Sequence, residues 1–124
     1  MPLIKNEIPI LEYDTEMQAV LMPGHTGNYR FTERAVLLFM EPEIDAYASA
    51  HHCRITGTFE CVTKTFHAYQ TKRGGREITF LQVPLGGSGA VQIMEQVIAA
   101  GAGKIIAAGC CGALEEGTEG DFFI

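Results

Sequence analysis

The feature that most constrains the fold is a tight glycine loop between two apolar segments. Residues 78–83 (ITFLQV) precede the loop 84–89 (PLGGSG), and a stretch with helical spacing follows the loop as far as Gly101. A second apolar run, residues 104–108 (KIIAA), comes next. A strand, a loop, a helix and a strand in this order form a right-handed βαβ unit with parallel strands. The sequence therefore predicts an α/β domain built on a partly parallel sheet.

Further segments extend this sheet. Residues 35–40 (AVLLFM) form a continuous apolar run, which is typical of a strand buried on both faces. Residues 57–82 read as strands that reverse at residues 72–76, where two adjacent glycines favour a turn. Residues 19–22 (AVLM) predict a short strand that runs into a turn at residues 23–24.

Two helices are expected beside these strands. Glu41 and Pro42 open the first, because proline suits the first helical turn, and its apolar face is predicted from Ile44, Tyr47 and Ala48. The second follows the glycine loop and ends near residue 100. The spacing predicts that its buried face consists of Val91, Met94, Val97 and Ile98.

Length and composition limit the domain organisation. A chain of 124 residues that is 47% hydrophobic is long enough for one core but not for two. Residues 35–124 carry the clear pattern, whereas residues 1–30 are poorly assigned. An acidic turn leads to a final apolar strand at residues 122–124, so we expect a single incomplete domain. The exposed strand edge also favours a homo-oligomer.

Charge and cysteine usage narrow the classes of partner. The net charge of −6 disfavours nucleic acids and anionic membrane surfaces, which bind mainly to basic patches. No apolar run approaches the roughly 18 residues of a membrane span, and no signal peptide is recognisable, so we expect a cytoplasmic protein. The chain has four cysteines and four histidines, but none of them are spaced as a CxxC or HxxxH motif. No metal site is therefore predicted.

The glycine loop is the main candidate for ligand binding. Glycines let a ligand approach the backbone closely, and the free amides of a helix start attract anions. We therefore predict that an anion binds at Gly86, Gly87, Ser88 and Gly89, where Ser88 either caps the helix or donates its hydroxyl to the ligand. Ordinary tight turns use the same residues. The chain has no GxGxxG motif and no Gly-Lys-Ser/Thr motif, which argues against a dinucleotide fold and a P-loop.

The order of motifs from residue 35 to residue 124 resembles the nucleoside phosphorylase superfamily. This superfamily includes purine nucleoside and uridine phosphorylases and the methylthioadenosine/S-adenosylhomocysteine nucleosidases. The matching elements are the strand and glycine loop, a helix with Glu95-Gln96-Val97, an apolar strand, the turn Gly109-Cys110-Cys111-Gly112, and Gly120-Asp121. The resemblance implies a central mixed sheet flanked by helices, with the chain corresponding to the N-terminal half of the family's domain.

The same resemblance implies an activity. Members of the superfamily cleave the N-glycosidic bond of nucleosides, with phosphate or water as the nucleophile. It implies no cofactor and no metal, although inorganic phosphate is a possible co-substrate, and it implies oligomers. Cys110, Cys111 and Gly112 occupy the turn that contacts the nucleoside in this family.

Departures from the family leave three interpretations open. Two phosphate-binding arginines of the phosphorylases are absent, since the equivalent positions hold Ile44 and Ala107. The segment Met40-Glu41-Pro42-Glu43 instead fits the Met-Glu-x-Glu pattern of the nucleosidases, in which the last glutamate activates water. Glu43 is thus a candidate general base, although an acidic residue also suits a helix start for structural reasons. A non-catalytic protein that binds a small anion or nucleoside, or only oligomerises, is the third interpretation.

Overall fold

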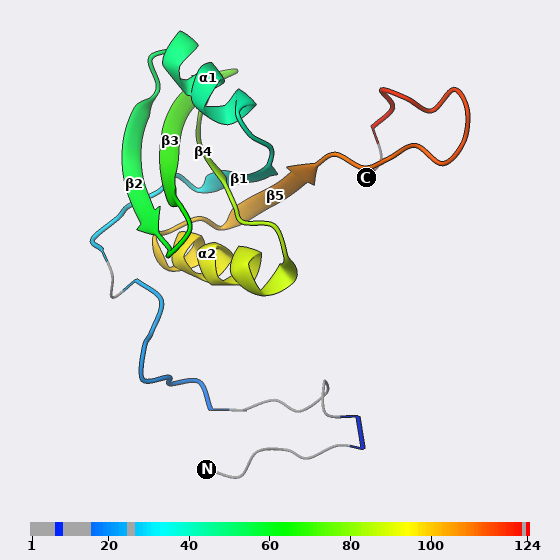
Figure 1. Ribbon diagram of the computed structural model, residues 1–124. Coiled ribbons are helices and arrows are strands. Elements are labelled where there is room, and N and C mark those ends of the chain that lie inside the picture. The colour runs from blue at the N-terminus through cyan, green and yellow to red at the C-terminus, as the bar shows by residue number, and fades with distance from the viewer. Residues whose placement is uncertain (1–6, 9–15, 25–26, 123) are drawn as a thin grey trace.

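The computed structural model describes residues 7–8, 16–24, 27–122 and 124, and its centre is a five-stranded mixed sheet (Figure 1). The strands are β1 (Arg34–Phe39), β2 (Arg54–Glu60), β3 (Thr65–Arg73), β4 (Arg76–Gln82) and β5 (Lys104–Gly109). Their order across the sheet is β2-β3-β4-β1-β5. β1 pairs in parallel with β4 and β5, whereas β2, β3 and β4 pair antiparallel. The predicted mixed, partly parallel sheet is confirmed.

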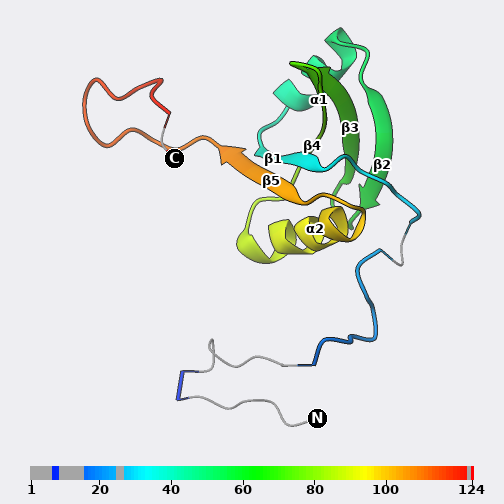
Figure 2. The same ribbon diagram turned by 180° about the vertical axis from the view of Figure 1, so that it is seen from behind.

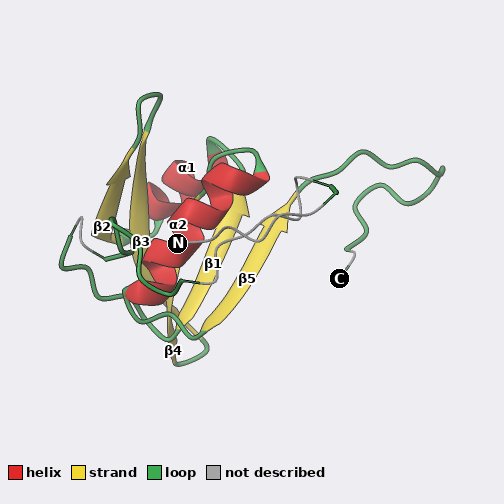
Figure 3. Cartoon of the chain, turned by 90° about the horizontal axis from the view of Figure 1, so that it is seen from below, coloured by secondary structure: helices red, strands yellow, loops and turns green. Residues whose placement is uncertain are grey.

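Two helices, α1 (Glu43–Ala50) and α2 (Gly87–Ala99), lie beside the strands (Figures 1 and 3). Their buried residues belong to two separate clusters on opposite faces of the sheet. Adjacent residues of a strand point to opposite faces, and the core follows this alternation. Leu81 packs in the cluster that includes Ile93 and Val97 of α2, whereas its neighbour Phe80 packs with Ile44 of α1. The two clusters give the molecule three layers with the sheet in the middle.

β1 is the central parallel strand because its side chains are apolar on both faces. Ala35 and Leu37 are buried in the cluster on the α2 side, and Val36 and Leu38 pack against the cluster on the α1 side. β4, α2 and β5 form the predicted crossover, and β1 lies between its two strands. The parallel order of this unit agrees with the prediction.

The antiparallel hairpin of β3 and β4 reverses at two glycines. Gly74 and Gly75 have φ angles of +54° and +75°, in the left-handed region that glycine adopts without a steric penalty. No atom lies near the position that a Cβ would take at either residue. The backbone angle, rather than close packing, therefore requires glycine at this turn.

Several detailed expectations were wrong. Residues 19–22 are not a strand, although a turn does follow at residues 23–24. On α2 the buried residues are Ile93 and Val97, whereas Val91 and Ile98 are 45% and 51% exposed. The apolar residues of α2 repeat along more than one face, so spacing alone did not identify the face that meets the sheet.

The C-terminal part also differs from expectation. β5 is an edge strand in the described part of the chain, and Ile106 is 67% exposed rather than buried. The segment after β5 leads away from the sheet (Figure 2), and neither Phe122 nor Ile124 belongs to a strand. Position 123 lies outside the described residues. Among the described residues, no helix has both the length and the apolar character needed to cross a membrane.

Candidate functional site

Three segments follow the carboxyl ends of the parallel strands. β4, β1 and β5 are adjacent and parallel, so the residues that follow each strand lie at the same end of the sheet. Val83 donates a backbone hydrogen bond of 3.0 Å to the Leu38 carbonyl, and Gly109 pairs with Phe39 on the other side of β1. The structure therefore places the glycine loop and residues 110–112 on either side of the end of β1. The turn expected at residues 109–112 is not formed, because Gly109 continues β5 and residues 110–112 are irregular.

The glycine loop leads directly into α2. Gly86 is the N-cap residue, with a φ angle of +104°, and its carbonyl accepts the first helical hydrogen bond, from the Ala90 amide at 3.0 Å. No side chain caps the helix, so Ser88 does not have the capping role that the sequence allowed. Ser88 is exposed in the first turn, and the amides at this helix start remain available to an anion.

Gly87 and Gly89 have different structural requirements. A Cβ at Gly89 would lie 2.9 Å from Cγ of Pro84, which is too close for an unchanged backbone. A Cβ at Gly87 would meet no atom within 4 Å. Contact with Pro84 thus explains why residue 89 is a glycine. At Gly87 the space beside the helix start is open, so packing does not require a glycine there.

The end of β1 carries the two glutamates of the Met-Glu-x-Glu pattern. Glu43 is the first residue of α1 and is exposed. Within the described chain its carboxylate has no hydrogen bond or ion pair. Glu41 lies between β1 and α1, and its carboxylate contacts Lys64, which directly precedes β3, and Gln82 at the end of β4.

Lys64 and Gln82 form a polar network with Glu41 that the sequence did not reveal. Lys64 Nζ donates to Glu41 Oε1 and, at 2.6 Å, to Gln82 Oε1, while Gln82 Nε2 donates to Glu41 Oε2 at 3.1 Å. The hydrogen bond from Lys64 lowers the pKa of the Glu41 carboxyl below its ordinary value, and that from Gln82 lowers it further. The three residues are separated by 18 to 41 positions along the chain, so only the folded sheet brings them together.

The residues predicted to contact a nucleoside follow β5. Cys110, Cys111 and Gly112 are exposed, and both thiols are free. No three histidine, cysteine, aspartate or glutamate residues gather closely enough to hold a metal ion in the part of the chain that the structure describes. The absence of a metal or other cofactor stays a prediction.

Two surface cavities lie away from this end of the sheet. One, of 780 Å³, is lined by residues 27–31, by Gly24 and by the end of α2 with the residues that follow it. The other, of 540 Å³, lies near the turn between β3 and β4. Neither cavity includes the glycine loop or residues 110–112, so the candidate site is an open surface formed by loops.

Comparisons with known proteins support the fold. No family model and no curated protein matches the sequence. A similar solved structure is the purine nucleoside phosphorylase from Toxoplasma gondii in complex with immucillin-H, with a TM-score of 0.57 and 19% identity. The match covers 83% of this chain and 41% of that protein. At this identity the likeness concerns the fold, and the present chain spans less than half the length of that protein.

Proposed function

We propose that this chain forms part of the active site of an enzyme that cleaves the N-glycosidic bond of nucleosides. The observation that carries the proposal is that the glycine loop, the end of β1 and residues 110–112 follow the same ends of three adjacent parallel strands. Ligands of open α/β sheets bind at the carboxyl ends of strands. Part of a purine nucleoside phosphorylase has a similar fold, which supports this choice of chemistry.

Each segment has a distinct role in this proposal. The transition state of N-glycosidic cleavage develops positive charge on the sugar, so an anion or an activated water must approach it. The amides of Gly87, Ser88 and Gly89 would hold the anion at the start of α2, and the Ser88 hydroxyl is free to donate to it. Cys110, Cys111 and Gly112 would lie against the nucleoside on the other side of β1.

Phosphorolysis and hydrolysis are distinguished by the need for phosphate. Purified chain is incubated with adenosine, uridine or methylthioadenosine, with and without inorganic phosphate, and release of the free base is measured. Phosphorolysis gives ribose 1-phosphate, or its methylthio analogue, and stops when phosphate is omitted. Hydrolysis continues without phosphate. No base release under either condition would contradict catalysis by this chain.

Hydrolysis is the second candidate, and Glu43 is the specific reason to consider it. Its carboxylate is exposed at the end of β1, and the arginines that phosphorylases use for phosphate are replaced by Ile44 and Ala107. In this scheme Glu43 accepts a proton from the attacking water. Glu41 is less suited to that role, because Lys64 stabilises its charged form.

Paired substitutions test the role of Glu43. General-base catalysis contributes about 10²–10⁴-fold, so Glu43→Gln is expected to lower base release without phosphate by at least about 100-fold. Glu41→Gln removes a carboxylate two residues away and is expected to have a smaller effect. Unchanged turnover in Glu43→Gln would remove Glu43 from the mechanism.

A non-catalytic protein is the third candidate. The phosphorylase of similar fold is more than twice as long as the region that matches this chain. More than half of that protein therefore has no equivalent in this chain. In this case the chain binds a nucleoside at the same loops without converting it. Calorimetry that shows nucleoside binding, combined with no base release, is the result that this candidate predicts.

A further inference from the structure

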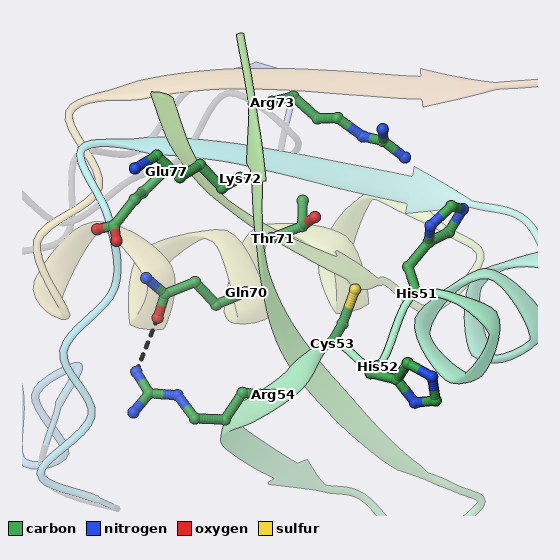
Figure 4. Close-up of a pocket in the computed structure, with 9 residues that line it drawn as sticks. All are labelled: His51, His52, Cys53, Arg54, Gln70, Thr71, Lys72, Arg73 and Glu77. Carbon is green, nitrogen blue, oxygen red and sulfur yellow. Dashed lines mark hydrogen bonds between the residues drawn. The ribbon is translucent and has the colours of Figure 1, made fainter. Parts of the chain in front are cut away.

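Two free thiols are adjacent in the chain directly after β5. Cys110 and Cys111 follow Gly109, the last residue of this strand, and both are exposed. The other two cysteines are isolated from each other and from this pair along the sequence. Cys61 is exposed between β2 and β3, and Cys53 lines the 540 Å³ cavity near the turn between β3 and β4 (Figure 4). Only the pair after β5 thus offers two neighbouring thiols.

The backbone around this pair is not held by regular structure. Gly109 is the last residue of β5 that pairs with β1, opposite Phe39, and residues 110–112 are irregular. In the described part of the chain, residues 110–112 make no backbone hydrogen bond to another segment. No atom lies within 4 Å of the position that a Cβ would take at Gly112. The backbone therefore has room to change its dihedral angles here.

This freedom decides whether two neighbouring thiols can form a bond. Consecutive Cα atoms are about 3.8 Å apart, which is less than the roughly 4.4–6.8 Å that disulfides usually span. A bridge between neighbours therefore requires an adjustment of the backbone, which a strand or helix would resist. Glycines on both sides of the pair make the adjustment easier. The strain that remains makes such a bond easy to reduce.

We propose that Cys110 and Cys111 are a reversible redox pair that hydrogen peroxide converts to a disulfide within one chain. One thiolate attacks a peroxide oxygen, the O–O bond breaks, and a sulfenic acid forms while the second oxygen leaves as water after taking up a proton. The neighbouring thiolate then attacks the sulfenic sulfur, the S–O bond breaks, and a second water leaves. The two sulfurs lose two electrons, which the peroxide accepts. Exposure and an adjacent resolving thiol are typical of peroxide-sensitive cysteines.

Oxidation at this position has a consequence for ligand binding. Cys110 and Cys111 are the residues proposed to lie against the nucleoside, and closing the ring changes the backbone at that contact. The oxidised chain is therefore expected to lose nucleoside binding, and a dithiol reductant is expected to restore it. This consequence rests on the proposed function, whereas the redox pair itself does not.

Peptide mapping tests the redox pair on the intact chain. The protein is treated with hydrogen peroxide, its remaining thiols are alkylated, and it is digested with trypsin. No lysine or arginine follows Lys104, so both thiols stay in one peptide, residues 105–124, which contains neither of the other cysteines. This peptide is expected to be about 2 Da lighter than the dithiol form, to resist alkylation, and to regain both thiols after treatment with dithiothreitol.

Serine variants separate the pair from a single reactive thiol. Cys110→Ser and Cys111→Ser each keep one thiol, so oxidation is expected to stop at a sulfenic acid that dimedone traps, with no disulfide inside the peptide. Cys61→Ser is the matched control, because it removes an exposed thiol that has no neighbouring cysteine, and it should leave the bridge unchanged. Disulfide-linked dimers, a bridge to Cys61, or sulfinic acid as the main product of the wild type would overturn the redox pair.

Nucleoside titration of both redox forms tests the consequence for binding. Amide shifts caused by adenosine, uridine or methylthioadenosine are expected at residues 86–89 of the reduced chain, to be lost after oxidation, and to return after reduction. Equal shifts in both forms would overturn the effect of the disulfide on binding. No shifts in the reduced chain would contradict the proposed function, and the mass of the peptide 105–124 would still decide whether the redox pair exists.

Discussion

Glu41 and Glu43 are two residues apart, yet the fold gives them different surroundings. Lys64 and Gln82 hydrogen-bond to Glu41 just after β1, whereas Glu43 is exposed at the start of α1. The sequence pattern identified both glutamates but could not distinguish them, because the partners of Glu41 are distant along the chain. This difference at the residue scale makes Glu43 the better candidate base.

Tyr69 fixes α1, and thus Glu43, to the sheet. Its hydroxyl donates to Asp45 Oδ1 at 2.9 Å, and its ring packs with Ile44 and Ala48. Burial, together with the hydrogen bond to Asp45, raises the pKa of Tyr69 to about 12. The folded state therefore holds this proton more tightly than the unfolded chain, whose tyrosine pKa is about 10.

The raised pKa of Tyr69 predicts a loss of stability in alkali. Its contribution is complete below pH of about 10 and is lost as the pH rises toward about 12, because the unfolded chain releases the proton first. Tyr69→Phe is expected to cost about 1 kcal/mol of unfolding free energy at pH 7. Urea unfolding at pH 7 and pH 11 checks this, and the difference between wild type and variant should shrink at pH 11. An equal difference in unfolding free energy at pH 7 and pH 11 would contradict the raised pKa of Tyr69.

At the scale of elements, the strand–loop–helix–strand unit could be predicted because its signals are local. The glycines of the loop, the apolar strand before it and the helical spacing after it all lie within some thirty residues. The strand predicted at residues 19–22 did not form, since an apolar run becomes a strand only beside a partner. The network of Lys64, Glu41 and Gln82 was not predicted either, because it depends on pairings between distant segments.

Two glycines of the loop give a paired prediction. Gly89→Ala places a methyl group 2.9 Å from Pro84 and is expected to lower the unfolding free energy by about 1–3 kcal/mol. Gly87→Ala meets no atom within 4 Å and is expected to be neutral or to stabilise by up to about 1 kcal/mol, since it restricts the unfolded chain. Urea unfolding of both variants measures the difference. Equal effects would contradict the described packing of the loop.

At the scale of the whole molecule, β5 leaves an unpaired edge on the sheet. Ile106 is 67% exposed on this strand, and in the described part of the chain no further strand pairs with it. We predict that two copies associate through this surface, because open apolar edges are usually covered. Homo-oligomerisation thus stays a prediction, and it depends on the exposed edge of β5.

Sedimentation velocity at micromolar concentration tests this association. Wild type is expected to sediment as an oligomer, and Ile106→Lys is expected to shift the population toward monomer. Ile98→Lys, which changes a half-exposed residue of α2, is the control and should leave the association unchanged. A well-folded wild-type monomer would contradict the prediction.

The central claim is that a nucleoside binds where β4, β1 and β5 end. Amide chemical-shift mapping of the intact, isotope-labelled chain during titration with adenosine, uridine or methylthioadenosine tests this directly. The account predicts saturable shifts at residues 86–89 and 110–112, and unchanged amides at residues 51–54 and 71–73. Shifts confined to other parts of the molecule, or no shifts at millimolar nucleoside, would contradict it.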